Sequence, residues 1–285
     1  MAEDKLLLDE DDARCPACGG SSWRRWRAVR SRRVIICRRC GLGIQKDPPP
    51  SAGELYDDNF YKGDVRYAYV DYGGDEHAHR RNARARLRSL EKLAGGWAGK
   101  RVLDVGGAYG FFLDEARRRG AVVEGVEVSA AAATYAREHL GLSVHTGAFA
   151  ATPLEGDFDV VTMFDYIEHV PDPAGDLARA RGLVKPGGVL VLSTGDRAAL
   201  AARLMGRRWH LIQPDYHLFY FTAPALRAML AAAGFRVARI SRPWRWLSLG
   251  AGLEKIAPGA RGRGSRTLVY VNLFDIVEVV AGADS

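Results

Sequence analysis

The stretch VLDVGGAYGFFLDEA (residues 102–116) decides which fold this chain is expected to have. A short apolar run that contains Asp104 leads into glycines at 106, 107 and 110, and an amphipathic helical pattern follows. A strand, a tight glycine turn and a helix are the parts from which α/β proteins build a nucleoside-binding crevice. The stretch therefore predicts a nucleoside site close to residue 106.

Strand and helix patterns alternate from Arg101 onward, through RVLDVG, FFLDEARRRG, VVEGVEV, AAATYAREHLG and LSVHT to VLVLST, APALRAMLAAAG and FRVARI. This alternation predicts an α/β fold with a mostly parallel sheet and helices on both faces. NLFDIVEVVAG (272–282) is expected to add a last, antiparallel strand, and HAHRRNARARLRSLEKLAGG (77–96) to form a helix that ends at Gly95 and Gly96.

The glycine turn excludes two common phosphate-binding loops. A dinucleotide fingerprint needs a third glycine at position 111, which is Phe111, and no Lys-Ser/Thr pair follows for a phosphate-cradling loop. Glu127 ends the next strand 23 residues after Asp104, where a carboxylate can bind the two hydroxyls of a ribose. The turn therefore favours a nucleoside ligand that is not bound through a pyrophosphate.

Four segments carry a resemblance to class I S-adenosylmethionine-dependent methyltransferases: VLDVGGAYGFFL, GVEVS, FDVVTMFDYIEHVPDP and LVKPGGVLVLST. The resemblance covers about Arg101 to Ile240 and implies a Rossmann-like sheet and S-adenosylmethionine as cofactor. It implies that Asp104 and the backbone at Gly106, Ala108 and Gly110 hold the methionine end, that Glu127 holds the ribose and that Val128 packs on the adenine. It also implies cofactor contacts for Phe164 and Asp165. Ala148 stands where many relatives have an acid for the adenine amino group, so Phe149 is expected to stack there instead.

All four cysteines lie in two CxxC pairs, Cys15 with Cys18 and Cys37 with Cys40. Two such pairs at this separation predict one tetrahedral, structural zinc in a small ribbon; the alternatives are two disulfides or free thiols. Ten Lys or Arg and no acid occur between Ala13 and Lys46. These arginines form either a solvated face or a clamp for phosphates, and Trp23 and Trp26 either pack in the ribbon or stack on bases.

The stretch CRRCGLGIQKDPPPSAGELYDDNFY (37–61) is similar to the N-terminal zinc modules of a bacterial subgroup that methylates sugars, glycan intermediates and secondary metabolites. This resemblance implies that Tyr61 belongs to a lid over the cofactor. The predicted organisation is an acidic tail (1–12), a zinc ribbon (13–46), linker and lid helices (47–96) and a methyltransferase domain (97–285).

Two histidines are the candidate catalytic bases. His169 follows the fourth strand in IEHVPDP, and His217 lies in PDYHLFYFT, which matches the segment that supplies the base in the sugar C-methyltransferases. Those enzymes have Glu directly before this histidine, where this chain has Tyr216, so an oxygen acceptor is as plausible as a carbon acceptor. An acid limb of the rate profile near the ordinary pKa of histidine is expected.

Composition and charge bear on partners and location. Apolar content of 47%, charged content of 26% and no long apolar run indicate a soluble, cytoplasmic protein, and the net charge of +7 favours an anionic partner. The segment RPWRWLSLGAGLEKI (242–256) is expected to be a helix packed over the sheet, or else a patch that contacts membranes peripherally. The favoured partner is a small-molecule acceptor, free or linked to a nucleotide, lipid or carrier. The rival hypotheses are an RNA methyltransferase that uses the basic ribbon, and a binding module without activity.

Overall fold

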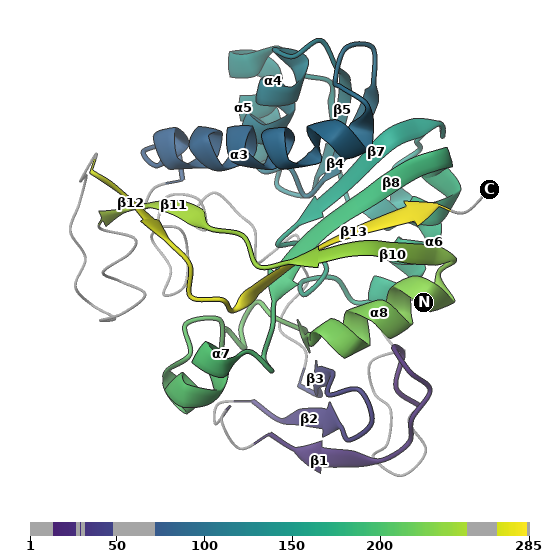
Figure 1. Cartoon of the computed structure of the whole chain (residues 1–285), viewed down its shortest axis with the longest axis vertical. Helices are drawn as coiled ribbons and strands as arrows, with labels where there is room; N and C mark the ends of the chain where they lie inside the picture. The colour runs from purple at the N-terminus through teal and green to yellow at the C-terminus, as the bar shows by residue number, and fades with distance from the viewer. Residues whose placement is uncertain (1–13, 27–28, 30–31, 48–71, 250–266, 284–285) are drawn as a thin grey trace.

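The computed structural model describes residues 14–26, 29, 32–47, 72–249 and 267–283, and it is built around a seven-stranded sheet (Figure 1). The strand order is β10-β13-β8-β7-β4-β5-β6, and β13 runs antiparallel to both of its neighbours. The predicted mostly parallel sheet with an antiparallel last strand is therefore confirmed. Its strands are β4 (Arg101–Val105), β5 (Val122–Glu127), β6 (Val144–Thr146), β7 (Phe158–Phe164), β8 (Val184–Gly195), β10 (Phe235–Ser241) and β13 (Ile276–Ala283).

Helices cover both faces of the sheet because successive strand residues point to opposite sides. On β4, Val102 belongs to a core with Leu87 of α3, whereas Leu103 belongs to the core on the other side, with Leu226 of α8. Figure 1 shows α3, α4 and α5 on one side and α6 and α8 on the other. The helices are α3 (Glu76–Ala94), α4 (Phe111–Arg117), α5 (Ala130–Leu140), α6 (Pro173–Leu183), α7 (Leu200–Met205) and α8 (Ala223–Ala232), with short 3₁₀ turns η2 (Phe149–Ala151) and η3 (Gly206–Arg208). The predicted end of α3 at Gly95, in a left-handed conformation, is confirmed.

The cysteine-containing ribbon is joined to the large domain through a shared sheet. Its strands β1 (Trp23–Arg25), β2 (Val34–Cys37) and β3 (Gly43–Gln45) continue into β9 (Phe219–Tyr220) of the large domain. Gly43 pairs with Tyr220, and the Thr222 hydroxyl donates to the carbonyl oxygen of Cys40 at 2.6 Å. The ribbon is thus hydrogen-bonded to the chain that immediately follows His217.

The segment expected to be a helix over the sheet instead starts a two-stranded arm, so that prediction is wrong over residues 245–248. β11 (Arg245–Ser248) pairs antiparallel with β12 (Leu268–Val271), and the arm projects beside α3 (Figure 1). Trp246 stacks on Tyr270 across the pair, and the Asn82 side chain both donates to and accepts from the Trp246 backbone at 2.8 Å. Cross-strand aromatic pairing and a distant partner strand override the local helical spacing.

Several sequence predictions lie outside the described residues: the acidic tail, Tyr61 and most of the linker. The predicted domain boundaries remain predictions. Within the described part, α3 shares its core with β4 and α4. None of the helices described here is long and apolar enough to cross a lipid bilayer.

Candidate active site

The glycine turn after β4 approaches the chain that follows β7 so closely that a side chain would not fit. A Cβ atom on Gly106 would lie 2.7 Å from the Tyr166 ring. Gly106, Ala108 and Gly110 all have positive φ, of 72°, 48° and 79°. The left-handed conformation costs a residue with a Cβ about 1–2 kcal/mol, so Ala108 is strained where the methyltransferase pattern has glycine. Such strain is typical of functional sites.

Two buried carboxylates flank this turn. Glu127 accepts one hydrogen bond from the Ala108 amide and one from the Ser129 amide, both at 2.8 Å, so it joins the glycine turn to the loop after β5. Asp104 accepts from the Thr162 hydroxyl at 2.5 Å. Burial, with the nearby charge of Glu127, raises the pKa of Asp104 to about 7. Two buried acids thus lie next to the glycine turn, and their charge would favour a positively charged ligand.

S-adenosylmethionine fits this part of the structure because it carries an ammonium group, a sulfonium and a ribose diol. Asp104 could hold the ammonium, and the second lone pairs of the Glu127 oxygens could accept from ribose hydroxyls. Val128 lies half-buried directly after β5, where an adenine would pack. The cofactor contacts remain predictions at the level of single residues.

Two of the predicted cofactor-contacting rings are largely enclosed by protein. Phe149 is only 2% exposed, and the Arg179 guanidinium lies 5.0 Å from its ring centroid. Phe164 lies under the Arg86 guanidinium, 3.8 Å from the ring centroid, and against Phe112. These positions leave little of either ring for stacking on the cofactor.

Asp165 is the centre of a charged cluster at the carboxyl end of β7. Arg245, on the arm, donates to both oxygens of Asp165 at 2.6 and 3.0 Å, and the Ser193 hydroxyl donates at 3.0 Å. Arg86 of α3 donates to the same hydroxyl at 3.1 Å. Burial favours the neutral acid, but the charges of Arg245 and then Arg86 prevail and hold the pKa of Asp165 at about 2.

The two candidate bases lie together although 48 residues separate them in the sequence. The rings of His169 and His217 are 4.7 Å apart between centroids, in an edge-to-face arrangement. Nδ1 of His169 lies 3.0 Å from the Tyr216 carbonyl oxygen, and Nδ1 of His217 lies 3.0 Å from that of Leu211. A carbonyl can only accept, so Nδ1 carries the proton in each neutral ring and Nε2 is the unprotonated nitrogen.

Burial makes both histidines weaker bases than expected. It lowers the pKa of His169 to about 4 and that of His217 well below the ordinary value. The expectation of an acid limb near the ordinary pKa of histidine is therefore wrong: the limb should lie well below it. Both imidazoles are neutral at neutral pH and can accept a proton.

Glu168 is a site residue that the sequence analysis did not single out. It offers an oxygen within 4.8 Å of donor atoms of both histidines, and its Oε2 is buried with no hydrogen-bond partner in the described structure. Burial, and next the charge of Asp165, raises the pKa of Glu168 to about 8, so it is protonated at neutral pH. Its place in IEHVPDP was the one signal available. Arg245 and Arg86 were also missed, because they come from the arm and from α3.

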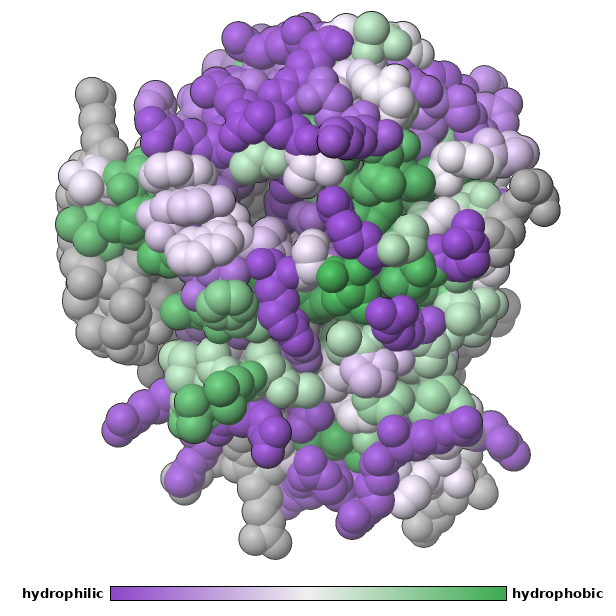
Figure 2. All heavy atoms as spheres, in the orientation of Figure 1, coloured by the Kyte–Doolittle hydropathy of each residue, from purple (hydrophilic) through white to green (hydrophobic). Residues whose placement is uncertain are grey.

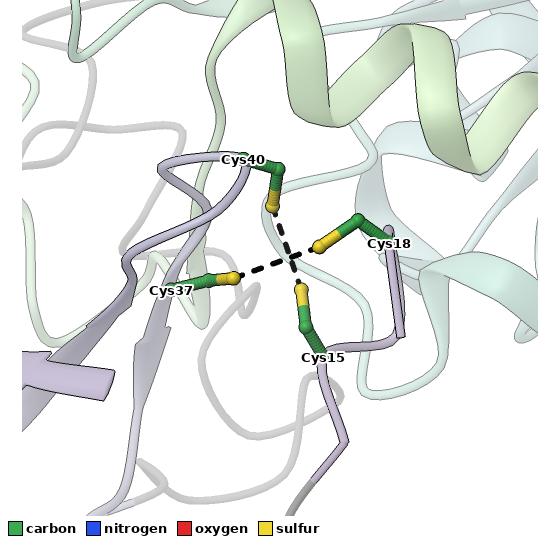
Figure 3. A group of neighbouring side chains, drawn as sticks. All are labelled: Cys15, Cys18, Cys37 and Cys40. Carbon is green, nitrogen blue, oxygen red and sulfur yellow. Dashed lines mark hydrogen bonds between the residues drawn. The ribbon is translucent and has the colours of Figure 1, made fainter. Parts of the chain in front are cut away.

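The four cysteines converge on one point (Figure 3). Sγ of Cys15 lies 3.5 Å from Sγ of Cys40, and Sγ of Cys18 lies 3.6 Å from Sγ of Cys37. A tetrahedral zinc with Zn–S bonds of about 2.3 Å would place its sulfurs about 3.8 Å apart. All four thiols are free, and their arrangement fits a zinc ribbon rather than two disulfides.

The basic side chains and tryptophans of the ribbon divide between packing and solvent. Arg38 and Arg39 donate to the carbonyl oxygens of Trp23 and Cys18, while Arg24 and Arg25 are exposed. Trp26 packs edge-to-face on Tyr220 at 5.0 Å. This tryptophan thus belongs to the junction with the large domain and does not offer a free platform for bases.

Comparison with known proteins gives the family. The profile of a methyltransferase-domain family matches residues 75–240, more than half of the chain. The ubiquinone biosynthesis O-methyltransferase of Acinetobacter baylyi is 36% identical over 153 residues, covering 47% of this chain and 63% of that protein. The protein of the same name from Pseudomonas aeruginosa is 41% identical over 119 residues, covering 39% of this chain and 51% of that protein.

Solved structures share the fold. Magnesium protoporphyrin IX methyltransferase from Synechocystis PCC 6803, solved with bound SAH, aligns with a TM-score of 0.55 at 17% identity, covering 81% of this chain and 99% of that one. The strand order and the helices on both faces define a Rossmann-like α/β fold. The chain belongs to the methyltransferase-domain family, and its fold is that of the class I S-adenosylmethionine-dependent methyltransferases.

Proposed function

We propose that the protein transfers the methyl group of S-adenosylmethionine to a hydroxyl oxygen of a small molecule, with His217 as the general base. The observation that carries the proposal is the close His169–His217 pair, whose Nδ1 atoms both face carbonyl oxygens. The similarity to proteins named O-methyltransferases supports oxygen as the acceptor atom.

The low pKa of His217 favours an acidic acceptor. A weak base removes a proton efficiently only from a group whose own pKa is not far above it. A phenol, with a pKa of about 10, is therefore a better match than a sugar alcohol or an unactivated carbon. His217 itself is buried, and the Tyr220 ring lies 5.9 Å from its ring, so water has little access to this side of the imidazole.

The cofactor supplies an electrophilic methyl group on a sulfonium, and the chain has to orient the acceptor and take its proton. The Nε2 lone pair of His217 accepts that proton, and the Leu211 carbonyl holds the ring in the required tautomer. Protonated Glu168 and neutral His169 add no negative charge that would trap the imidazolium.

We further propose that Cys15, Cys18, Cys37 and Cys40 hold a structural zinc. Four thiolates close the coordination shell, so this zinc has no position for a substrate or water. Its contribution is to the fold of the ribbon, which is hydrogen-bonded to β9 beside His217.

The test combines an acceptor panel with the His217→Asn variant. Methyl-labelled S-adenosylmethionine is offered with 3,4-dihydroxybenzoate, a nucleotide-linked hexose or total tRNA, and the product is identified by mass spectrometry. We expect a methyl ether of the phenol. Labelled tRNA would instead support the RNA methyltransferase hypothesis.

His217→Asn should lower turnover about 10²- to 10⁴-fold and leave the affinity for S-adenosylhomocysteine unchanged. His139→Asn, a histidine of α5 stacked on Tyr135, is the matched control and should keep full turnover. Full activity of His217→Asn would overturn the assignment of the base. A strict need for added Mg²⁺ would overturn it too, because a cation bound among Glu168, His169 and His217 would then activate the acceptor.

A further inference from the structure

Exposed apolar side chains are concentrated on one face, formed by α7 and the β11–β12 arm. Of the eight large apolar side chains that are exposed among the described residues, two lie elsewhere, Leu93 and Val122. Figure 2 shows green and pale side chains gathered over α7 and the arm, with purple ones at their margin. We define the apolar face by the other six: Leu200, Leu204, Trp244, Leu249, Tyr270 and Phe274.

Ring stacking fixes the aromatic side chains of the apolar face in place. Trp244 stacks on Tyr270 with 5.2 Å between ring centroids and contacts Phe274 edge-to-face at 6.4 Å. On the other side of Tyr270 lies Trp246, with Arg81 over its ring at 4.7 Å. The rings support one another while about half of the surface of Trp244, Tyr270 and Phe274 remains in solvent. Trp and Tyr are the side chains that favour the boundary between water and lipid.

The aliphatic part comes from a single turn of α7. Leu200 and Leu204 are four residues apart, so they lie on the same side of the helix, and they are 69% and 77% exposed. Ala202, between them, is buried. The arginines at 203, 207 and 208 are all exposed, and they follow or interrupt the two leucines. An apolar surface with a basic margin is the composition of an interfacial membrane contact.

The two parts are held together through Asp275. The Asp196 amide, just before α7, donates to the Asp275 carbonyl oxygen at 2.7 Å. The Trp209 indole, just after η3, donates to the Asp275 carboxylate at 2.8 Å. Since Asp275 directly follows Phe274, the aliphatic and aromatic parts form one connected surface.

We infer that the apolar face docks the protein on an anionic lipid surface. Charge complementarity selects this partner: the chain carries a net charge of +7 and the margin of the face is formed by exposed arginines. A symmetric contact between two copies would bring those arginines toward each other, and like charges oppose such a contact. An anionic bilayer supplies the opposite charge and accepts the protruding Leu and Trp side chains.

Docking in this way would bring the lipid to an opening near the active site. A hollow lined by His210, Arg245, Leu247, Val271 and Ile276 lies between the two parts of the face. Arg245 reaches from that hollow to Asp165. Docking itself does not depend on the proposed reaction.

The test is flotation of the full chain with vesicles made of equal parts phosphatidylglycerol and phosphatidylcholine. We expect the wild-type protein to float with these vesicles, and to do so much less with pure phosphatidylcholine or at high salt. The double variant Leu200→Ser/Leu204→Ser should lower the partition coefficient at least about tenfold. Arg207→Gln/Arg208→Gln should lower it about tenfold or more on anionic vesicles only.

The matched control is Leu93→Ser/Val122→Ser, which removes the two exposed apolar side chains outside the face and should float like the wild type. Circular dichroism of each variant establishes that it is folded. Wild-type protein that stays off anionic vesicles would overturn the inference, as would equal flotation of the Leu200→Ser/Leu204→Ser variant. Loss of a dimer in that variant, seen by light scattering without any vesicle binding, would make the face an interface between copies.

Discussion

The cysteine ribbon (β1 to β3) and the β11–β12 arm both contact the candidate active site, and they are held in place by different means. Strand β3 of the ribbon pairs with β9, which lies next to His217 in the chain. The arm brings Arg245 to Asp165, close behind Phe164 at the end of β7. One region has four cysteines in a fixed spacing, and the other has hydrogen bonds and stacked rings.

This difference explains why one region is visible in the sequence and the other is not. Metal ligation requires particular residue types at particular spacings, so the two CxxC pairs predict the ribbon from the sequence. The arm requires only that β11 pair with β12, about 20 residues further along the chain. Many different sequences can form such a strand pair. Parts of a site that have no characteristic residue pattern can be recognised only once the folded structure is known.

The largest expected effect comes from breaking the ribbon with Cys37→Ser. Structural zinc contributes about 10–16 kcal/mol in isolated zinc modules, so its loss should unfold β1 to β3. Because Gly43 pairs with Tyr220, we expect faster amide hydrogen exchange in β9 as well, while β4 to β8 stay protected. Metal analysis should give one zinc per chain for the wild type.

Arg24→Gln, on the exposed side of β1, is the control and should keep both the zinc and the protection. From the sequence alone, loosening is expected to stop at the ribbon. Unchanged exchange of the Tyr220 amide in Cys37→Ser would favour that simpler expectation and contradict the coupling.

A second variant, Glu127→Ala, tests the predicted ribose contact, which belongs to the central sheet and to neither the ribbon nor the arm. Removing two charge-assisted hydrogen bonds to the ribose should weaken S-adenosylhomocysteine binding by about 2–4 kcal/mol, measured by calorimetry. Glu127→Gln keeps one acceptor oxygen and should lose less. Glu124→Gln, three residues earlier on β5 and paired with His145, is the control and should bind normally. Equal affinities in all three variants would mean that the ribose lies elsewhere.

The smallest effect is expected for Arg245→Gln, which releases the arm from Asp165. Both side chains are partly exposed, at 20% and 32%, so screening limits the loss of stability to about 1–2 kcal/mol at neutral pH. The pKa of Asp165 is held at about 2, below its unfolded value of about 3.9, so this contribution exists above about pH 4 and disappears as the pH falls toward 2.

Urea unfolding across this range is the measurement, with Arg88→Gln on the exposed side of α3 as the control. The difference in the free energy of unfolding between wild type and Arg245→Gln should disappear on acidification. Arg88→Gln should have the same free energy of unfolding as the wild type at every pH. A gap that persists at the lowest pH would show that Arg245 stabilises the arm by packing and not through the Asp165 carboxylate.

The class of fold, the cofactor and the cysteine pairs can all be predicted from residue patterns along the chain. Asp104, the glycine turn and Glu127 sit at fixed distances along one strand–turn–helix–strand unit, so their geometry follows from local structure. The antiparallel last strand, β13, was predicted as well.

The surroundings of the candidate base, by contrast, depend on how the chain folds in three dimensions, and the folded structure was needed to find them. It joined His217 to His169 and Glu168, brought Arg245 from the arm to Asp165, and turned the expected helix at 245–248 into a strand. It also lowered the pKa of both histidines. Burial and long-range pairing cause each of these changes, and both depend on residues far apart in the chain that no local pattern records.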